Sequence, residues 1–276
     1  MTSVTRLFAL FPALLAATAA LAAPGLTVGG LNEFDVELPA ELRQMAGRGQ
    51  VSPVKRALVT IAVPAKLDMA HDWPVLVISA TSDPQFNSSR RLLRAYADTA
   101  LAAGWIVVAA DAAEQVPVEQ DDVPLRLALT TAALAALELQ WPGTGKAPLA
   151  FGGFSGGAKH SGWLAAAYAS QGRNIIGIYL AGVNEDILVA AAEYFLVLDA
   201  RFRNIPVFLQ SGEADIVATP ADHQSVYADL KRAGFRRVRI EYFPGAHDVN
   251  PRPLRNALEW FHALEFHPAA PPPAAR

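Results

Sequence analysis

The chain has 276 residues, of which 52% are hydrophobic and 18% charged, a balance that indicates a folded protein with a substantial core and excludes a disordered one. Its formal net charge of −3 and pI near 6.1 give no basic field that would attract nucleic acid or an anionic membrane surface. The chain has no cysteine, which excludes disulfides and thiol-ligated metals.

The first residues have the pattern of a secretory signal peptide. Arg6 precedes an apolar run from Leu7 to Leu21, and the run leads into Ala20-Leu21-Ala22, an A-x-A cleavage pattern. We expect cleavage after Ala22, so that residues 1–22 are removed and the mature protein is secreted or periplasmic. An uncleaved N-terminal anchor is the alternative interpretation.

Four strands are predicted before the middle of the chain. Phe34–Leu38 and Ala57–Val63 are the first two, and the former alternates as an antiparallel strand with one wet face does, so we expect an opening hairpin or ribbon. Pro74–Ala80 and Trp105–Asp111 are continuous apolar runs, which are typical of strands that helices bury on both faces. The acidic loop 114–122 that follows is expected to be a solvated surface.

Helices separate the later strands. Ser88 and Ser89 can cap a helix that Gly104 stops. The other predicted helices are Leu125–Leu139, Ser161–Tyr168, 186–199, Thr219–Ala233 and Arg252–Leu264, and the other predicted strands are Ala147–Gly153, Ile175–Ala181, Pro206–Ser211 and Val238–Phe243. This alternation predicts an α/β fold whose mainly parallel sheet is flanked by helices on both faces, after antiparallel N-terminal strands. We expect one domain over residues 23–267 and a disordered tail over 268–276.

Residues 153–157 match G-x-S-x-G, in which a serine lies on a sharp strand-to-helix turn with its hydroxyl exposed above the sheet. The string alone is weak evidence, because it arises by chance in roughly one chain of this length in ten. Here Ser155 falls between a predicted strand and a predicted helix, which is the context that the motif requires.

An acid and a histidine follow two later strands. The loop after the strand that ends at Ser211 contains Asp215, and the loop after the strand that ends at Phe243 contains His247. In a parallel sheet the functional groups gather beyond the carboxyl ends of the strands. Ser155, Asp215 and His247 therefore follow three strand ends in the order serine, acid, histidine, which is the order of α/β-hydrolase triads.

With these features the chain resembles the α/β-hydrolase superfamily, specifically its small, nearly capless branch of dienelactone-hydrolase-like and polyhydroxybutyrate-depolymerase-like esterases. The resemblance covers about Pro74–Leu264 and is carried by residues 104–111, the elbow at Ser155, and residues 211–215 and 245–248. It implies the α/β-hydrolase fold and a serine hydrolase that cleaves small or polymeric carboxylic esters through an acyl-enzyme, without a cofactor.

The resemblance also implies a role for each site residue. Ser155 would attack the carbonyl carbon, His247 would accept the serine proton and return it to the leaving group, and Asp215 would orient the imidazole. The backbone N–H of Gly156 would be one oxyanion donor, at a helix N-terminus where the dipole favours negative charge.

The second oxyanion donor is where the chain departs from the family pattern. Many esterases have His-Gly after the strand that here ends at Ala80, whereas this chain has T-S-D (residues 81–83). We assign the second donor to the backbone N–H of Thr81, with the hydroxyl of Thr81 or Ser82 as an additional candidate. Asp83 is expected to point to solvent or to cap the helix that follows, because a carboxylate facing the oxyanion would oppose catalysis.

Some of these roles have a second candidate residue. Asp186 is the substitute acid, and His160 and His223 are rival bases, the latter expected to be exposed on its helix. A peptidase or an amidase on the same triad is the second interpretation, and a catalytically silent binding protein that keeps the fold is the third. Neither an H-E-x-x-H spacing nor a G-x-G-x-x-G after an early strand occurs, so no metal or dinucleotide is expected.

The segment 182–204 lies where relatives insert a lid. Its length allows at most one helix with its connections, so we expect no large cap and a fairly open cleft. Phe154, Trp163 and Tyr194 are candidates to line that cleft, although aromatic residues at helical spacing are more often part of a core.

Overall fold

The structure is a computed structural model that describes residues 25–67 and 73–266. The predicted signal peptide over residues 1–22 and the predicted tail over residues 268–276 lie outside these residues. Among the helices in the described ranges, none combines the length and the apolar character that crossing a membrane requires.

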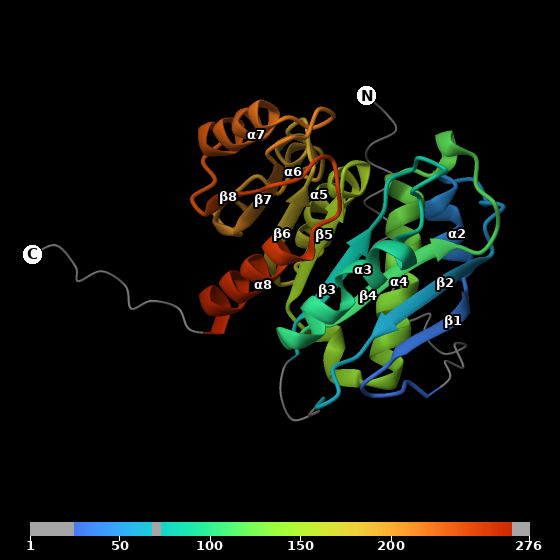
Figure 1. Ribbon diagram of the computed structural model, residues 1–276. Helices are drawn as coiled ribbons and strands as arrows, with labels where there is room; N and C mark the ends of the chain where they lie inside the picture. The colour runs from blue at the N-terminus through green and yellow to red at the C-terminus, as the bar shows by residue number, and fades with distance from the viewer. Residues whose placement is uncertain (1–24, 68–72, 267–276) are drawn as a thin grey trace, which may run out of the picture.

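Eight strands form one sheet in the order β1-β2-β4-β3-β5-β6-β7-β8 (Figure 1). The strands are β1 (Leu31–Glu37), β2 (Arg56–Ala62), β3 (Val75–Ser79), β4 (Ile106–Ala112), β5 (Leu149–Phe154), β6 (Ile175–Ala181), β7 (Val207–Gly212) and β8 (Val238–Phe243). β2 pairs antiparallel with both β1 and β4, and every later pair is parallel. The predicted α/β class, with a mainly parallel sheet and an antiparallel start, is confirmed.

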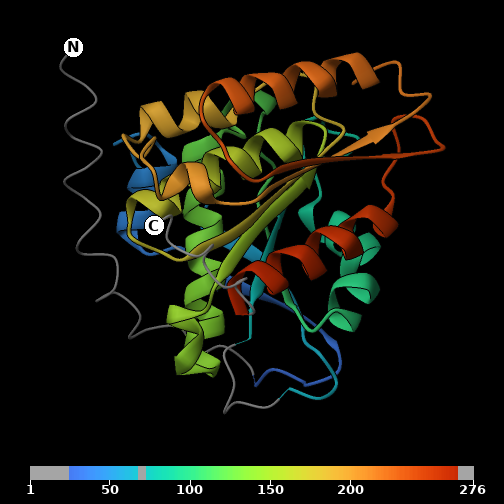
Figure 2. The same cartoon turned by 90° about the vertical axis from the view of Figure 1, so that its left-hand side faces the viewer.

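Helices cover both faces of the sheet. They are α2 (Ala40–Ala46), α3 (Ser89–Ala102), α4 (Val123–Gln140), α5 (Gly156–Ser170), α6 (Leu188–Tyr194), α7 (Pro220–Arg232) and α8 (Pro251–Phe266). Figure 2 shows α3 and α8 together on one side of the sheet and α4 and α5 on the other. The predicted cap of α3 is confirmed, because Ser88 Oγ accepts a hydrogen bond from the N–H of Arg91 at 3.1 Å.

The alternation of side chains along β3 shows why this strand is apolar throughout. Val75 and Val77 pack into the core under α4 and α5, whereas Leu76 and Ile78 pack into the core under α3 and α8. Successive side chains of a strand point to opposite faces, so a strand covered on both sides has no polar face. The sheet therefore leaves only its two edges and the ends of its strands for other interactions.

Two segments differ from their predictions. β1 and β2 pair as expected but not as a hairpin, because the seven-residue helix α2 lies in their connection and buries Leu42 and Met45. α6 is shorter than the predicted 186–199: Asp186 Oδ1 accepts hydrogen bonds at its start, and Leu196 follows it at a φ of 56°. A left-handed residue of this kind commonly terminates a helix.

A buried ion cluster connects the elements around the loop after β3. Arg126, on α4 and only 4% exposed, donates through Nε and Nη2 to the two carboxylate oxygens of Asp121, each at 2.6 Å. Its Nη1 donates to Ser89 Oγ at 2.8 Å and lies 3.4 Å from a carboxylate oxygen of Asp111. Its Nη2 also lies 3.4 Å from the carbonyl oxygen of Thr81. The prediction that the acidic loop 114–122 is only a solvated surface is therefore wrong for Asp121.

We expect Arg126→Leu to lower the free energy of unfolding by about 3–5 kcal/mol, because the substitution leaves buried carboxylates without their cation. The control is Arg232→Leu: the side chain of Arg232 is 74% exposed, and its guanidinium pairs with Asp229 on the surface. Its effect should stay below about 0.5 kcal/mol. Urea unfolding of both variants beside the wild type measures the difference, and equal losses would contradict a structural role for the cluster.

Candidate active site

Ser155 occupies a sharp turn between β5 and α5. Its backbone is at φ 55° and ψ −124°, a left-handed conformation that a residue with a side chain adopts only under constraint. Its N–H donates to the carbonyl oxygen of Ala181 at 2.8 Å, which ties the turn to β6. The predicted strand-to-helix turn at the G-x-S-x-G is confirmed.

The glycines of the motif permit a close crossing of strand and helix. A methyl group on Gly153 would overlap the carbonyl oxygen of Gly157, and a methyl group on Gly157 would overlap the carbonyl oxygen of Ser79. A methyl group on Gly156 would overlap Thr81 Oγ1, so the start of α5 lies directly against the loop after β3. The first N–H groups of a helix have no intrahelical partners, and this crossing brings those of α5 to the carboxyl end of the sheet.

Asp215 and His247 form a hydrogen-bonded acid–base pair. Asp215 follows β7 and is 4% exposed, and its Oδ2 accepts a hydrogen bond from His247 Nδ1 at 2.7 Å. Its Oδ1 accepts the N–H groups of Val217 and Ala218, each at 2.8 Å. Burial by itself would raise the pKa of Asp215, but the hydrogen bonds from Ala218, His247 and Val217 outweigh it and lower that pKa. A carboxylate at this position holds the proton of His247 on Nδ1 and leaves Nε2 free to accept another.

Close neighbours fix the plane of the His247 ring. The ring of Phe154 lies 4.6 Å away between centroids, and a methyl group on Gly182, at φ 61°, would lie 3.0 Å from His247 Cε1. Ser155 and His247 line one cavity, but no hydrogen bond joins their side chains in the described part of the chain. Catalytic hydrogen bonds are often long without substrate and tighten in the reacting complex.

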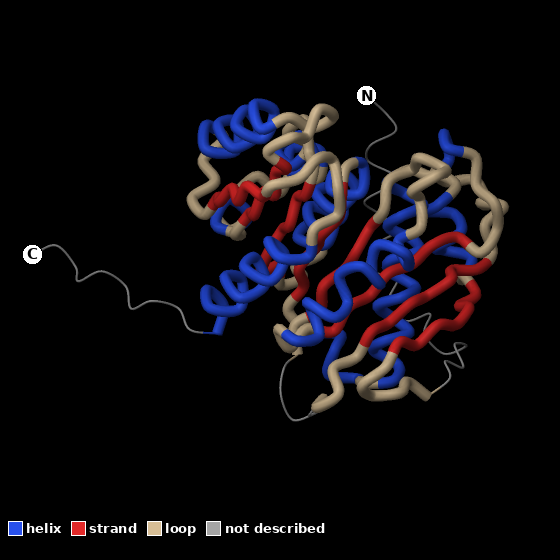
Figure 3. Tube along the Cα trace, in the orientation of Figure 1, coloured by secondary structure: helices blue, strands red, loops and turns tan. Residues whose placement is uncertain are grey.

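The cavity beside Ser155 has a volume of about 510 Å³. Most of its lining is apolar, and the apolar side chains are those of Ala80, Phe86, Leu92, Ala95, Phe154, Val217 and Val249. Thr81 lies at its wall and Asp83 at its exposed rim. Figure 3 shows the loops after the strands as tan segments, and the cavity lies among those that follow β3, β5, β7 and β8.

The loop after β3 differs in part from its prediction. Ser82 Oγ donates to the carbonyl oxygen of Asp121 at 2.6 Å, so its only hydrogen is used and the expected assistance to an oxyanion is wrong. Thr81 Oγ1 accepts the N–H of Asp83 at 3.3 Å and lies against Gly156. Asp83 is exposed, as expected, and its carboxylate accepts the N–H of Gln85 at 3.0 Å.

His160, a rival base in the sequence, instead supports this loop from behind. Its Nδ1 donates to the carbonyl oxygen of Ala80 at 2.9 Å, and its Nε2 lies 3.4 Å from Ser82 Oγ. Burial lowers the pKa of His160, and the nearby Arg126 guanidinium lowers it further. A neutral imidazole therefore holds the loop, a contact that the sequence pattern did not reveal.

His223 and Asp186 also have structural partners away from the cavity. His223 is buried, which contradicts its expected exposure: its Nδ1 donates to the carbonyl oxygen of Thr219 at 3.0 Å, and burial lowers its pKa. Asp186 accepts the N–H groups of Leu188 and Val189 and so caps α6. Its burial raises the pKa of its carboxyl group despite these bonds. In residues 25–67 and 73–266, no group of three or more His, Asp or Glu side chains is placed to hold a metal ion.

The segment 182–204 leaves the cavity open. It forms α6 and a short 3₁₀ turn (Phe202–Asn204), and none of its residues lines the cavity. Trp163 and Tyr194 contact each other at 5.5 Å between ring centroids where α6 packs on α5, so neither lines the site. Of the three aromatic candidates, Phe154 alone contributes to the cavity.

Comparison with known proteins shows similarity in structure. No protein-family model matches this chain, and no curated protein is similar enough to match it. An α/β serine hydrolase without a lid from Xanthomonas campestris is 17% identical and has a TM-score of 0.57, with 90% of this chain and 100% of that one covered. A putative α/β hydrolase of unknown function from Agrobacterium tumefaciens is 16% identical, with a TM-score of 0.58 and coverage of 88% and 100%.

A thermostable esterase from Pseudomonas putida is 16% identical, with a TM-score of 0.56 and coverage of 94% of this chain and 89% of that one. At such identities the likeness establishes the fold, and the chemistry has to be argued from the residues of the site. The strand order, the elbow turn and these neighbours agree with one another. The chain therefore has the α/β-hydrolase fold, and the resemblance seen in its sequence is confirmed at that level.

Proposed function

We propose that this protein is an exported serine hydrolase that cleaves carboxylic esters through an acyl-enzyme. The observation that carries the proposal is the 2.7 Å hydrogen bond between His247 Nδ1 and the buried Asp215 Oδ2, because His247 lines the same cavity as the elbow residue Ser155. A serine hydroxyl is a weak nucleophile without a base, and an imidazole whose other nitrogen bonds a carboxylate is the base that acyl transfer requires.

In this mechanism Ser155 Oγ attacks the ester carbonyl while His247 Nε2 takes its proton. The imidazolium is stabilised by the Asp215 carboxylate and then protonates the leaving alcohol. The N–H of Gly156, at the start of α5, is proposed as one oxyanion donor, and the N–H of Thr81 as the second. A donor of this kind is worth on the order of 3 kcal/mol in the transition state. Water then releases the acyl group by the same steps in reverse.

The apolar lining of the cavity favours a substrate whose acyl group is apolar and binds there. Its rim includes Phe86 and Val217, which are 62% and 56% exposed, so the apolar surface continues from the wall of the cavity to the outside. No residue of the segment 182–204 covers it. An open, apolar cleft accommodates bulky or polymeric esters as well as small ones, and esterases are among the structural neighbours.

Export is proposed from the signal-peptide pattern of residues 1–22. The mature protein isolated after secretion should start at Ala23. N-terminal sequencing tests this expectation, and a chain that starts at Met1 or Thr2 would contradict it.

The proposed activity is tested with p-nitrophenyl acetate, butyrate and octanoate. We expect turnover by the wild type, with KM lower for the longer esters because their acyl chains fill the apolar cavity. Ser155→Ala, His247→Gln and Asp215→Asn should each lower kcat/KM by about 10⁴-fold or more, since the three groups act as a unit.

The matched control is Ser161→Ala. It removes a buried hydroxyl of α5, the helix that follows Ser155, and this hydroxyl has no hydrogen-bond partner among the described residues. It should retain full activity. Cleavage of the corresponding p-nitroanilides but not of the esters would favour an amidase. Binding of the esters without turnover of either series would indicate a silent binding protein, and both results would overturn the proposal.

A further inference from the structure

The two edges of the sheet carry different charge patterns. The edge strand β1 has only acidic charges, Glu33, Asp35 and Glu37, so pairing with another β1 would bring like charges together. β8, at the other edge, reads V-R-I-E-Y-F and pairs with β7 in an unbroken register. Natural proteins usually protect an edge strand with a bulge, an inward charge, a lysine or a proline. β8 has no bulge, lysine or proline within its six residues, and its two charged residues, Arg239 and Glu241, have opposite signs.

The free backbone groups of β8 can be assigned from its pairing with β7. The carbonyl oxygens of Arg237 and Phe243 accept the N–H groups of Val207 and Glu213, which belong to the β7 side. Because the N–H and C=O groups of successive residues point to alternate sides of a strand, residues 239 and 241 also face β7. Val238, Ile240 and Tyr242 therefore direct their N–H and C=O groups away from the sheet, at its open edge.

An antiparallel pair of β8 strands about a two-fold axis at Ile240 matches these groups. Each free N–H and C=O group then faces its counterpart, with Ile240 opposite itself and Val238 opposite Tyr242 of the second copy. Arg239 falls opposite Glu241 of the second copy in a non-hydrogen-bonded position, where cross-strand side chains come closest. The charges and the hydrogen-bonding pattern thus select the same register.

The other registers with the correct hydrogen-bonding direction are unfavourable. A two-fold axis at Arg239 or at Glu241 would place that residue opposite its own copy, which sets two like charges together. A two-fold axis at Val238 would place Arg237 opposite Arg239, two like charges. An axis at Tyr242 would bring Pro244 into the ladder, and proline has no N–H to donate. The sequence of β8 is therefore complementary to itself in one register only.

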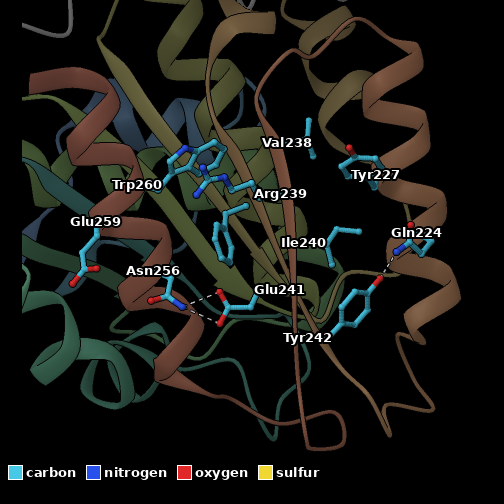
Figure 4. Close-up of a pocket in the computed structure, with 11 residues that line it drawn as sticks. Gln224, Tyr227, Val238, Arg239, Ile240, Glu241, Tyr242, Asn256, Glu259 and Trp260 are labelled. Carbon is cyan, nitrogen blue, oxygen red and sulfur yellow. Dashed lines mark hydrogen bonds between the residues drawn. The ribbon is translucent and has the colours of Figure 1, made fainter. Parts of the chain in front are cut away.

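The surroundings of β8 leave room for a second strand. A hollow of about 740 Å³ follows the strand between α7 and α8 (Figure 4), and Ile240 and Tyr227 are among the residues that line it. On the α8 side, Arg239 lies over the ring of Trp260 at 4.3 Å. Glu241 accepts hydrogen bonds from Asn256 Nδ2 at 2.9 and 3.0 Å. These contacts within one chain hold both charged side chains on the same face of the strand, without a second copy.

We propose that β8 is a homodimerisation strand, which pairs antiparallel with β8 of a second copy about a two-fold axis at Ile240. The two eight-stranded sheets then continue as one through the interface. The proposal rests on the edge strand alone and is independent of the proposed hydrolase activity.

Light scattering during size-exclusion chromatography of the purified protein tests the charge pairing. We expect a wild-type dimer, and Arg239→Glu or Glu241→Arg should raise its Kd about tenfold or more, because each change sets like charges opposite one another at two places. The double variant, Arg239→Glu with Glu241→Arg, restores opposite charges and should restore the dimer. A monomeric wild type, or a double variant as weak as the single ones, would overturn the proposal.

A cysteine cross-link tests the register, because the chain has no cysteine of its own. In the proposed pair, the two Ile240 Cα atoms lie about 5.5 Å apart, within the range of a disulfide. Ile240→Cys should therefore form a covalent dimer on mild oxidation of the native protein. The matched control is Tyr242→Cys, whose two copies would lie about 13 Å apart along the strands and should not cross-link. Equal cross-linking of the two variants, each shown to be folded by circular dichroism, would contradict this register.

Discussion

The close crossing of β5 and α5 is the constraint on which the rest of the site depends. Neither Gly153 nor Gly157 has room for a methyl group, and the turn between them holds Ser155 at φ 55°. Such a conformation costs about 1–3 kcal/mol and persists only where the surrounding structure determines it. Here β5, a strand buried on both faces, imposes this conformation. The result is that the serine and the N-terminus of α5 meet at the carboxyl end of the sheet, where charge that develops on a substrate would be stabilised.

Separate groups support the two sides of this serine. Asp215 orients His247 on one side, from the loops after β7 and β8. On the other side, Arg126 and His160 bind the backbone of the loop that carries Thr81. Burying the Arg126 guanidinium is expensive, and its two short bonds to a buried carboxylate offset that cost. The loop that lacks the usual His-Gly sequence is thus held by a buried ion cluster, and its backbone remains available to line the cavity.

The sequence predicted those parts of the structure that have strong local signals. The bounds of β6, Ile175–Ala181, agree with the prediction because a continuous apolar run is interrupted at both ends. The triad candidates follow strand ends, and the ends of parallel strands meet at one edge, so their proximity could be inferred from order alone. α2 was missed because it is short and has no capping side chain. The burial of Asp121 and His223 depends on segments distant in sequence, which a local pattern of charged residues does not reveal.

The central claim is that Ser155 is the nucleophile and that its reactivity comes from His247. Covalent labelling with a fluorophosphonate, followed by digestion and mass spectrometry of the peptides, tests this most directly, because the probe reacts only with an activated serine and remains attached to it. We predict one adduct, on the peptide that contains Ser155, formed much more slowly in His247→Gln. An adduct on a different serine, or none on the folded wild-type protein, would contradict this claim.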